Sequence, residues 1–242
     1  MRRSAVLSCR FNEAMPLFVL VCVAAWCLTA AGSAWAGTVK GTVRFTGAGT
    51  EQKMLPVILD QNVCGKEKEA GALVLSPDKG IRNAVVSLRL PPAGAKWAGL
   101  VPPVQMDQKE CVFVPRVVVV PVGGTVEFLN TDRLLHNLHS LSSENRTFNR
   151  TQPKGRTIPI GFKKPEIIRV DCDLHPWMRA WVVVADHPFY TVTTDRGEFI
   201  LDNLPPGTYT VQVWQETLGT VTKEVTVSDQ GITPLTMEMR QP

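Results

Sequence analysis

The sequence predicts an all-β protein built as a sandwich of sheets. Its 242 residues include 18 glycines and 18 prolines, which divide the chain into short runs rich in β-branched residues. Such runs, separated by turn residues, are typical of strands in sandwiches and barrels. No long segment repeats its apolar residues at the helical period, so we do not expect a layer of helices. The expected strands lie in GTVKGTVRFTG, NAVVSLRL, RVVVVPVGGTVEFL, IIRVDC, AWVVVAD, YTVTTDRGEFIL, GTYTVQVW and TKEVTVS.

Residues 1–36 have the pattern of a secretory signal peptide. A positive start and an apolar run precede a small-x-small cleavage site: Arg2, Arg3 and Arg10, then residues 17–31, then Ala34-Trp35-Ala36. A membrane anchor is the alternative, but the apolar run is short for a span. We therefore expect a periplasmic or secreted protein that begins at Gly37 and is not inserted in a membrane after cleavage.

Four side chains in two segments are the ligand types of a mononuclear copper site. Cys172, His175 and Met178 lie in VDCDLHPWMRAWVVV, and His136 lies upstream in VEFLNTDRLLHNLHS. One thiolate, two imidazoles and a weak axial thioether form the ligand set of blue-copper electron-transfer sites. The soft sulfur ligands favour copper over calcium or magnesium. The alternative is that Cys172 is a small buried apolar residue and Met178 fills the core.

The pattern of apolar residues explains how three of these ligands would converge. EIIRVDC is expected to be a strand with Ile168, Val170 and Cys172 on its core face, and RAWVVVAD is expected to be the next strand. Cys172, His175 and Met178 then lie at a corner formed by a strand, a loop and the next strand. His136 is distant in the sequence and must be brought to this corner by the fold. His139 is at an odd offset from His136 and would face the other way on a strand, so we expect it to be structural or exposed. A ligand role is not expected for His187 either.

Residues 104–186 resemble a cupredoxin of the amicyanin and plastocyanin type. The resemblance is carried by FVPRVVVVPVGGTVEFLNTD, by HN at 136–137 and by C-x-x-H-x-x-M at 172–178, whose second gap is as short as in amicyanin. It implies a Greek-key sandwich with one copper that alternates between Cu(I) and Cu(II). It implies the ligand set of His136, Cys172, His175 and Met178. It also implies that Asn137 forms a hydrogen bond near the cysteine and ties the two ligand loops together.

The same resemblance implies a surface through which electrons leave. In these families the loop histidine reaches the surface within an apolar patch that contacts the redox partner. Here His175 would be exposed, and the patch would consist of Leu134, Leu135, Pro176 and Trp177. The alternative is that Trp177 packs inward, against Trp181 or a second sandwich, and that the patch is covered.

A second resemblance concerns the C-terminal part of the chain. YTVTTDRGEFILDNLPPGTYTVQVW resembles the carboxypeptidase regulatory-like, transthyretin-like sandwich. That family opens with a G-x-V and an A-x-V strand, and the matching residues here are Gly41 to Val43 and Ala84 to Val86. We therefore expect residues 37–91 and 187–242 to form one discontinuous sandwich, with a copper module at residues 101–186 inserted in it or packed on it. Residues 50–80 match neither family, and residues 142–164 are expected to be a crossover loop.

Removal of the signal peptide leaves three cysteines, Cys64, Cys111 and Cys172. If Cys172 binds copper, an even pair remains, and export permits a disulfide. We therefore expect a Cys64–Cys111 bridge, with two buried free thiols as the alternative.

These patterns together predict a carrier of single electrons between periplasmic proteins, such as a c-type cytochrome or a dehydrogenase. The alternative is a copper-binding or docking module for storage, sensing or delivery. Catalysis by this chain is not expected, because four histidines are too few for an oxygen-activating copper cluster and no hydrolase or phosphate-loop motif is present. A formal charge of only +4, without a basic stripe, argues against nucleic acid as a partner.

Overall fold

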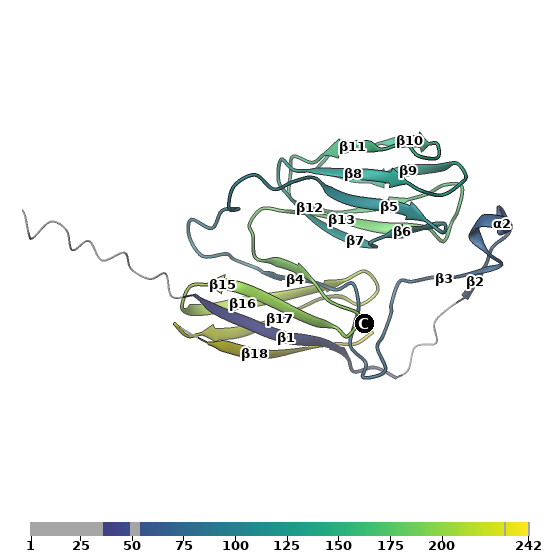
Figure 1. Cartoon of the computed structure of the whole chain (residues 1–242). Helices are drawn as coiled ribbons and strands as arrows, with labels where there is room; N and C mark the ends of the chain where they lie inside the picture. Colours follow the sequence, from purple (N-terminus) through teal and green to yellow (C-terminus); the bar gives the residue numbers. More distant parts are fainter. Residues whose placement is uncertain (1–35, 49–53, 230, 242) are drawn as a thin grey trace, which may run out of the picture. The chain divides into compact units, whose positions relative to one another are not determined.

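The computed structural model describes residues 36–48, 54–229 and 231–241, and nearly all regular structure within them is β (Figure 1). The predicted all-β class is confirmed. The described residues fall within one compact unit of the chain. The predicted signal peptide lies outside the described residues apart from Ala36. In the part of the chain that is described, no helix has the length and apolar character needed to cross a membrane.

Two facing sheets build the first sandwich, in the strand orders β10-β9-β12-β13-β7 and β11-β8-β5-β6. Its strands are β5 (Val104–Lys109), β6 (Val112–Val114), β7 (Val117–Pro121), β8 (Thr125–Asn130), β9 (His136–Leu141), β10 (Asn149–Gln152), β11 (Ile158–Gly161), β12 (Glu166–Asp171) and β13 (Arg179–Ala185). Alternate residues of these strands enter one core, as Val126 and Phe128 do from β8 and Ile168 and Val170 do from β12. The predicted crossover loop at residues 142–164 is wrong in part, because β10 and β11 lie within it and pair with β9 and β8.

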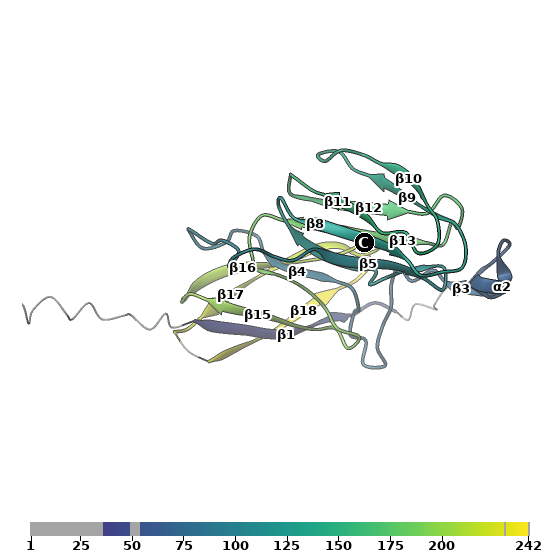
Figure 2. The ribbon, with the colours of Figure 1, turned by 45° about the horizontal axis from the view of Figure 1, so that its top comes forward.

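The second sandwich combines strands from both ends of the described chain, in the orders β15-β1-β18 and β14-β4-β16-β17 (Figures 1 and 2). Its strands are β1 (Gly37–Phe45), β4 (Val85–Leu88), β14 (Tyr190–Val192), β15 (Glu198–Leu204), β16 (Gly207–Gln215), β17 (Gly219–Val227) and β18 (Ile232–Met239). β1 pairs with both β15 and β18, and β4 pairs with both β14 and β16. Gly41 is required in β1, because a Cβ there would lie 1.9 Å from the Leu235 carbonyl oxygen. These pairings support our proposal that residues 37–91 and 187–242 form one discontinuous domain around an inserted module.

An apolar contact joins the two sandwiches. Val85 of β4 is buried together with Val117 of β7 and Val183 of β13. Beside them the rings of Trp181 and Trp214 meet edge to face at 4.9 Å. At the same junction the guanidinium of Arg116 donates two hydrogen bonds to the Glu216 carboxylate, at 2.7 and 3.1 Å. The first sandwich is therefore held to the second by packing as well as by its two chain connections.

Residues that the sequence left unassigned form a small separate element with β2 (Met54–Pro56), α2 (Gln61–Cys64) and β3 (Glu67–Glu69). β2 and β3 pair with each other, and α2 is the single turn of helix between them. The expected Cys64–Cys111 disulfide is present and ties α2 to the turn between β5 and β6. This element is therefore fixed to the first sandwich even though it precedes the second sandwich's β4 in the sequence.

Glu166 anchors the turn that follows β9, the strand that begins at His136. Its carboxylate accepts hydrogen bonds from the Ser142 hydroxyl and the Ser143 amide, each at 2.6 Å, and from the Asn145 side chain at 3.0 Å. Burial alone would raise the pKa of Glu166, but these hydrogen bonds outweigh it and lower the pKa to about 2.

Glu166 should contribute a pH-dependent part of the stability. Because its pKa is lower in the folded protein, the contribution is complete above the unfolded value of 4.5 and is lost as the pH falls towards about 2. Urea unfolding between pH 5 and pH 2 should therefore show a smaller loss of stability for Glu166→Gln than for the wild type. Glu144→Gln, a neighbour whose side chain is exposed, should follow the wild type. Parallel pH profiles for Glu166→Gln and the wild type would contradict this role.

The shared sheets also predict the behaviour of a fragment. Residues 187–242 lack β1 and β4, the strands at inner positions of the two sheets of the second sandwich. Expressed alone, this fragment should leave its apolar faces open and show neither a cooperative thermal transition nor a dispersed amide spectrum. A cooperatively melting fragment would show that the C-terminal strands form an independent domain.

Candidate metal centre

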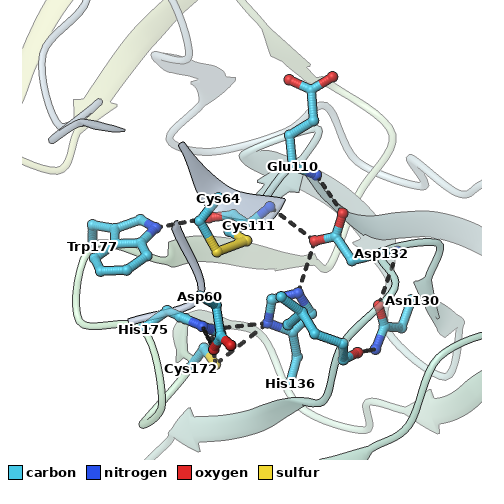
Figure 3. The surroundings of a disulfide bond; sticks show 11 residues. Asp60, Cys64, Glu110, Cys111, Asn130, Asp132, His136, Cys172, His175 and Trp177 are labelled. Atoms are coloured by element: carbon cyan, nitrogen blue, oxygen red, sulfur yellow. Dashed lines mark hydrogen bonds and ion pairs between the residues drawn. A yellow bond between two sulfur atoms is a disulfide. The ribbon is translucent and has the colours of Figure 1, made fainter. Parts of the chain in front are cut away.

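Three predicted ligands converge in the core of the first sandwich. The Nδ1 atoms of His136 and His175 lie 3.1 Å apart. The Cys172 Sγ atom lies 3.9 Å from the first of them and 3.6 Å from the second. All three side chains are buried, and Figure 3 shows them directed toward one another. Two imidazole nitrogens and one sulfur therefore face a common point.

The alternation of β12 positions the cysteine. Ile168 and Val170 point into the core, and Cys172 continues the same phase one residue beyond the end of the strand. The loop then closes on itself, because the His175 amide donates to the Cys172 carbonyl and the Cys172 amide donates to the Met178 carbonyl. Met178 is buried in the same core cluster as Cys172. The predicted strand–loop–strand corner is present.

Asn137 connects the two ligand-bearing segments. Its backbone amide lies 3.5 Å from the Cys172 Sγ atom and donates to it. Its side-chain oxygen accepts a hydrogen bond from the Asp173 amide at 2.6 Å, and its side-chain nitrogen donates to the Asp173 carboxylate at 3.0 Å. The link that the cupredoxin resemblance implied for Asn137 is therefore present in the structure.

Each histidine is held from behind by a carboxylate. Asp132 Oδ2 lies 2.8 Å from His136 Nε2, and Asp60 Oδ2 lies 3.1 Å from His175 Nε2. A carboxylate at Nε2 places the proton there and leaves the Nδ1 lone pair free for a metal. Asp132 also accepts the Glu110 and Cys111 backbone amides, at 2.6 and 2.8 Å (Figure 3). The two Nδ1 atoms are therefore directed inward by fixed rings.

Sequence reasoning missed both carboxylates. Asp132 could have been suspected, because it lies four residues before His136, in the loop that leads into β9. Asp60 had no local signal. The only sequence signal that bears on its position is the even number of remaining cysteines, which pairs nearby Cys64 with Cys111.

Burial sets the protonation of the candidate ligands His136 and Cys172. It lowers the pKa of His136, against the opposing effect of the Asp132 hydrogen bond, and so favours a neutral imidazole. It also raises the pKa of the Cys172 thiol, against the opposing effect of the Asn137 amide. A metal would bind here with release of the thiol proton.

The predicted exit surface is wrong for two of its residues. His175 is fully buried, and Trp177 is only 6% exposed. The Trp177 indole N–H donates to the Cys111 carbonyl at 2.9 Å, and its ring lies 5.2 Å from the His175 ring. Trp177 therefore packs inward, as the alternative prediction had it, but its partner is Cys111, whereas Trp181 or the second sandwich had been expected. Of the other patch residues, Pro176 and Leu135 are exposed and Leu134 is partly buried.

The two remaining histidines lie outside the cluster. His139 is 38% exposed in its side chain and contacts the Asp173 carboxylate at 2.9 Å. His187 is buried, and its Nε2 donates to the Leu88 carbonyl at 3.1 Å. The position of His139 agrees with the structural or surface role expected for it.

Comparison with known proteins gives one family match and several structural matches. The family model of the carboxypeptidase regulatory-like domain matches residues 173–240. This range contains β13 to β18, extends upstream of residue 187 and does not include β1 or β4. No curated protein matches the sequence.

Three of the structural matches are a copper-containing nitrite reductase, a cupredoxin and an amicyanin, each aligned over less than half of this chain. A copper-containing nitrite reductase from Thermus scotoductus SA-01 is 27% identical over 42% of this chain, with a TM-score of 0.34, and only 28% of its own length is covered. A purple cupredoxin from Nitrosopumilus maritimus is 23% identical over 34% of this chain and 99% of its own, with a TM-score of 0.30. A reduced amicyanin variant is 24% identical over 43% of this chain and 99% of its own, with a TM-score of 0.33.

Asp132 should be essential for the stability of this end of the sandwich, with or without metal. Asp132→Ala leaves the buried Cys111 amide and the His136 Nε2–H without their acceptor. We expect the metal-free protein to lose about 2–4 kcal/mol of unfolding free energy, since each unsatisfied buried donor costs roughly 1–3 kcal/mol. Urea denaturation measures the loss, and Arg133→Ala, at the exposed neighbouring position, is the control. A change as small as that of the control would contradict the assigned role.

Proposed function

We propose that this chain is an exported mononuclear type-1 copper protein that carries single electrons between periplasmic redox proteins. One observation carries the proposal: the Nδ1 atoms of two buried histidines and the sulfur of one buried cysteine face a common point within 4.8 Å of one another. This donor set, of one soft sulfur and two imidazoles, fits copper. Met178, in the same core cluster, is the proposed axial ligand.

The surrounding residues suit a site that must hold its shape. Bound copper would supply one-electron chemistry by alternating between Cu(I) and Cu(II). The chain's own contribution is rigidity, because β9 and β12, which bring His136 and Cys172 together, are adjacent paired strands of one sheet. Asp132 fixes one imidazole, and the Asn137 amide donates to the sulfur. A ligand set fixed in this way needs little rearrangement when its charge changes.

The second candidate is a copper-binding or docking module without a carrier role. The C-terminal match to a regulatory-like domain favours docking as an additional task of the second sandwich. Storage or delivery would require ligands that exchange readily, whereas His136, Cys172 and His175 are all buried. Catalysis is not part of the proposal, since the two histidines left over, His139 and His187, lie outside the cluster and could not form a second copper centre with it.

Export and a redox-protein partner belong to the same proposal. The signal-peptide pattern of residues 1–36 supports export, and a disulfide between Cys64 and Cys111 suits an oxidising compartment. A c-type cytochrome or a periplasmic dehydrogenase is the proposed class of partner.

Visible spectroscopy tests the function. The mature protein with Cu(II) should bind one copper per chain and show an intense blue or green band from thiolate-to-copper charge transfer. Cys172→Ser and His136→Ala should abolish the band, because each removes a ligand, while thermal melting still shows a folded sandwich. His139→Ala, which removes a histidine outside the cluster, should retain it. A protein that binds copper without this band would contradict the type-1 assignment and favour the storage alternative.

A further inference from the structure

The outer edge of the ligand His175 is covered by a segment from far upstream in the chain. Residues 57–66, here called the Asp60 segment, include α2 and the residues on either side of it. Asp60 Oδ2 lies 3.1 Å from His175 Nε2. The His175 side chain has no exposed surface, whereas the Asp60 side chain is 49% exposed. Asp60 therefore lies between the imidazole and the solvent.

The local structure of Asp60 points to this role. It occupies the N-cap position of α2, where an aspartate usually accepts a hydrogen bond from an amide of its own helix. Here its side chain makes no such bond. Its backbone has φ 56° and ψ 32°, in the left-handed region, which aspartate adopts more readily than most residues other than glycine. The carboxylate is thus not used by its own helix and contacts His175 instead.

The Asp60 segment is closed at its base. The Val57 amide donates to the Lys66 carbonyl at 2.9 Å, and the Gln61 side chain donates to the Val57 carbonyl at 2.6 Å. The Asp60 carbonyl in turn accepts the amides of Val63 and Cys64, at 2.9 and 2.8 Å. These bonds make the segment a small rigid loop that can present one carboxylate in a fixed place.

The disulfide attaches this loop to the metal end. Cys64 is the last residue of α2, and Cys111 lies in the turn between β5 and β6. Cys111 also donates its amide to Asp132 and accepts the indole N–H of Trp177, and Trp177 lies beside His175. One cystine therefore connects the carboxylates behind both histidine ligands (Figure 3).

We propose that Asp60 is a positioning residue for His175 and that the disulfide-held Asp60 segment closes the imidazole edge of the metal site. It follows that electrons do not enter or leave through an exposed His175, and that metal leaves the site slowly. The copper-loaded test below depends on the proposed function. The protection of His175 in the metal-free protein does not.

An ordinary surface ion pair is the competing explanation. Pairs between exposed groups contribute little to stability and can be removed without consequence. Asn62 provides the matched control, because it is exposed in the same turn of α2 and lies two residues from Asp60. If the Asp60 contact is incidental, Asp60→Ala and Asn62→Ala should behave alike.

Chemical modification of the metal-free protein tests closure directly. Diethyl pyrocarbonate is added, and the modification of each histidine is followed by peptide mass spectrometry. His139, partly exposed, is the internal reference. His175 should react slowly in the wild type and in Asn62→Ala. In Asp60→Ala and in the Cys64→Ser/Cys111→Ser double variant, the rate at His175 should approach that of His139. Asp60→Asn keeps an oxygen acceptor and should stay close to the wild type.

Copper release tests positioning. In Asp60→Ala the transfer of copper to a strong Cu(I) chelator should be faster by about ten- to a hundredfold, because losing a partner behind a metal-bound histidine usually weakens metal affinity by that factor. Asn62→Ala should match the wild type, and the visible band should shift only in the variants that free His175.

Each result decides the matter. If His175 stays as protected in Asp60→Ala as in the wild type, or if Asn62→Ala exposes it equally, the proposal is wrong. If circular dichroism shows that Asp60→Ala does not fold, the double serine variant replaces it as the variant that should expose His175, and Asp60→Asn remains the conservative control. If the wild type binds no copper, the proposed function fails while the modification result still decides whether the Asp60 segment closes the site.

Discussion

Cys111 is the point on which the metal end of this protein depends. Its sulfur holds Cys64 and with it the Asp60 segment, its amide binds Asp132, and its carbonyl accepts Trp177. Through these three contacts, Asp60, Asp132 and Trp177, which surround the two histidines, are all attached to Cys111 in the β5–β6 turn. In the chain-entropy model, a cross-link between residues 47 positions apart contributes about 4 kcal/mol. The disulfide therefore stabilises the arrangement that presents two Nδ1 atoms to one thiol.

The second sandwich is linked to the first through both ends of the inserted segment and through side-chain contacts. Because β1 and β4 lie in sheets completed by β14 to β18, the two ends of the first sandwich are both attached to the same folded body. The Arg116–Glu216 pair and the contact of Trp181 with Trp214 add to this attachment. Trp181 lies in β13, the strand that follows the loop carrying His175, so its contact with Trp214 attaches that strand to the second sandwich.

His175 is buried, whereas the C-x-x-H-x-x-M motif led us to expect an exposed imidazole edge. A C-x-x-H-x-x-M loop specifies which atoms could bind a metal, but not which side of the site faces a partner. Here an element from residues 54–69 occupies the place where an exposed imidazole edge was expected. Two residues of the predicted patch, Leu135 and Pro176, are exposed, as is Leu174, whereas His175 and Trp177 are buried and take no part in that surface.

The link through Asn137 was implied only by the cupredoxin resemblance. Local patterns in the sequence determined the strands, the turn-rich sandwich class, and the convergence of Cys172 and Met178 at one corner. They did so because period-two alternation and short ligand spacing are encoded within a few residues. The even number of cysteines left beside Cys172 also predicted one contact between distant residues, the Cys64–Cys111 disulfide. Only the tertiary structure decided that Asp60 and Asp132 lie behind the histidines, that Trp177 packs inward, and that β10 and β11 form in an apparently irregular stretch. These features depend on pairings between distant segments, and a contact between residues 60 and 175 leaves no period or motif at either position.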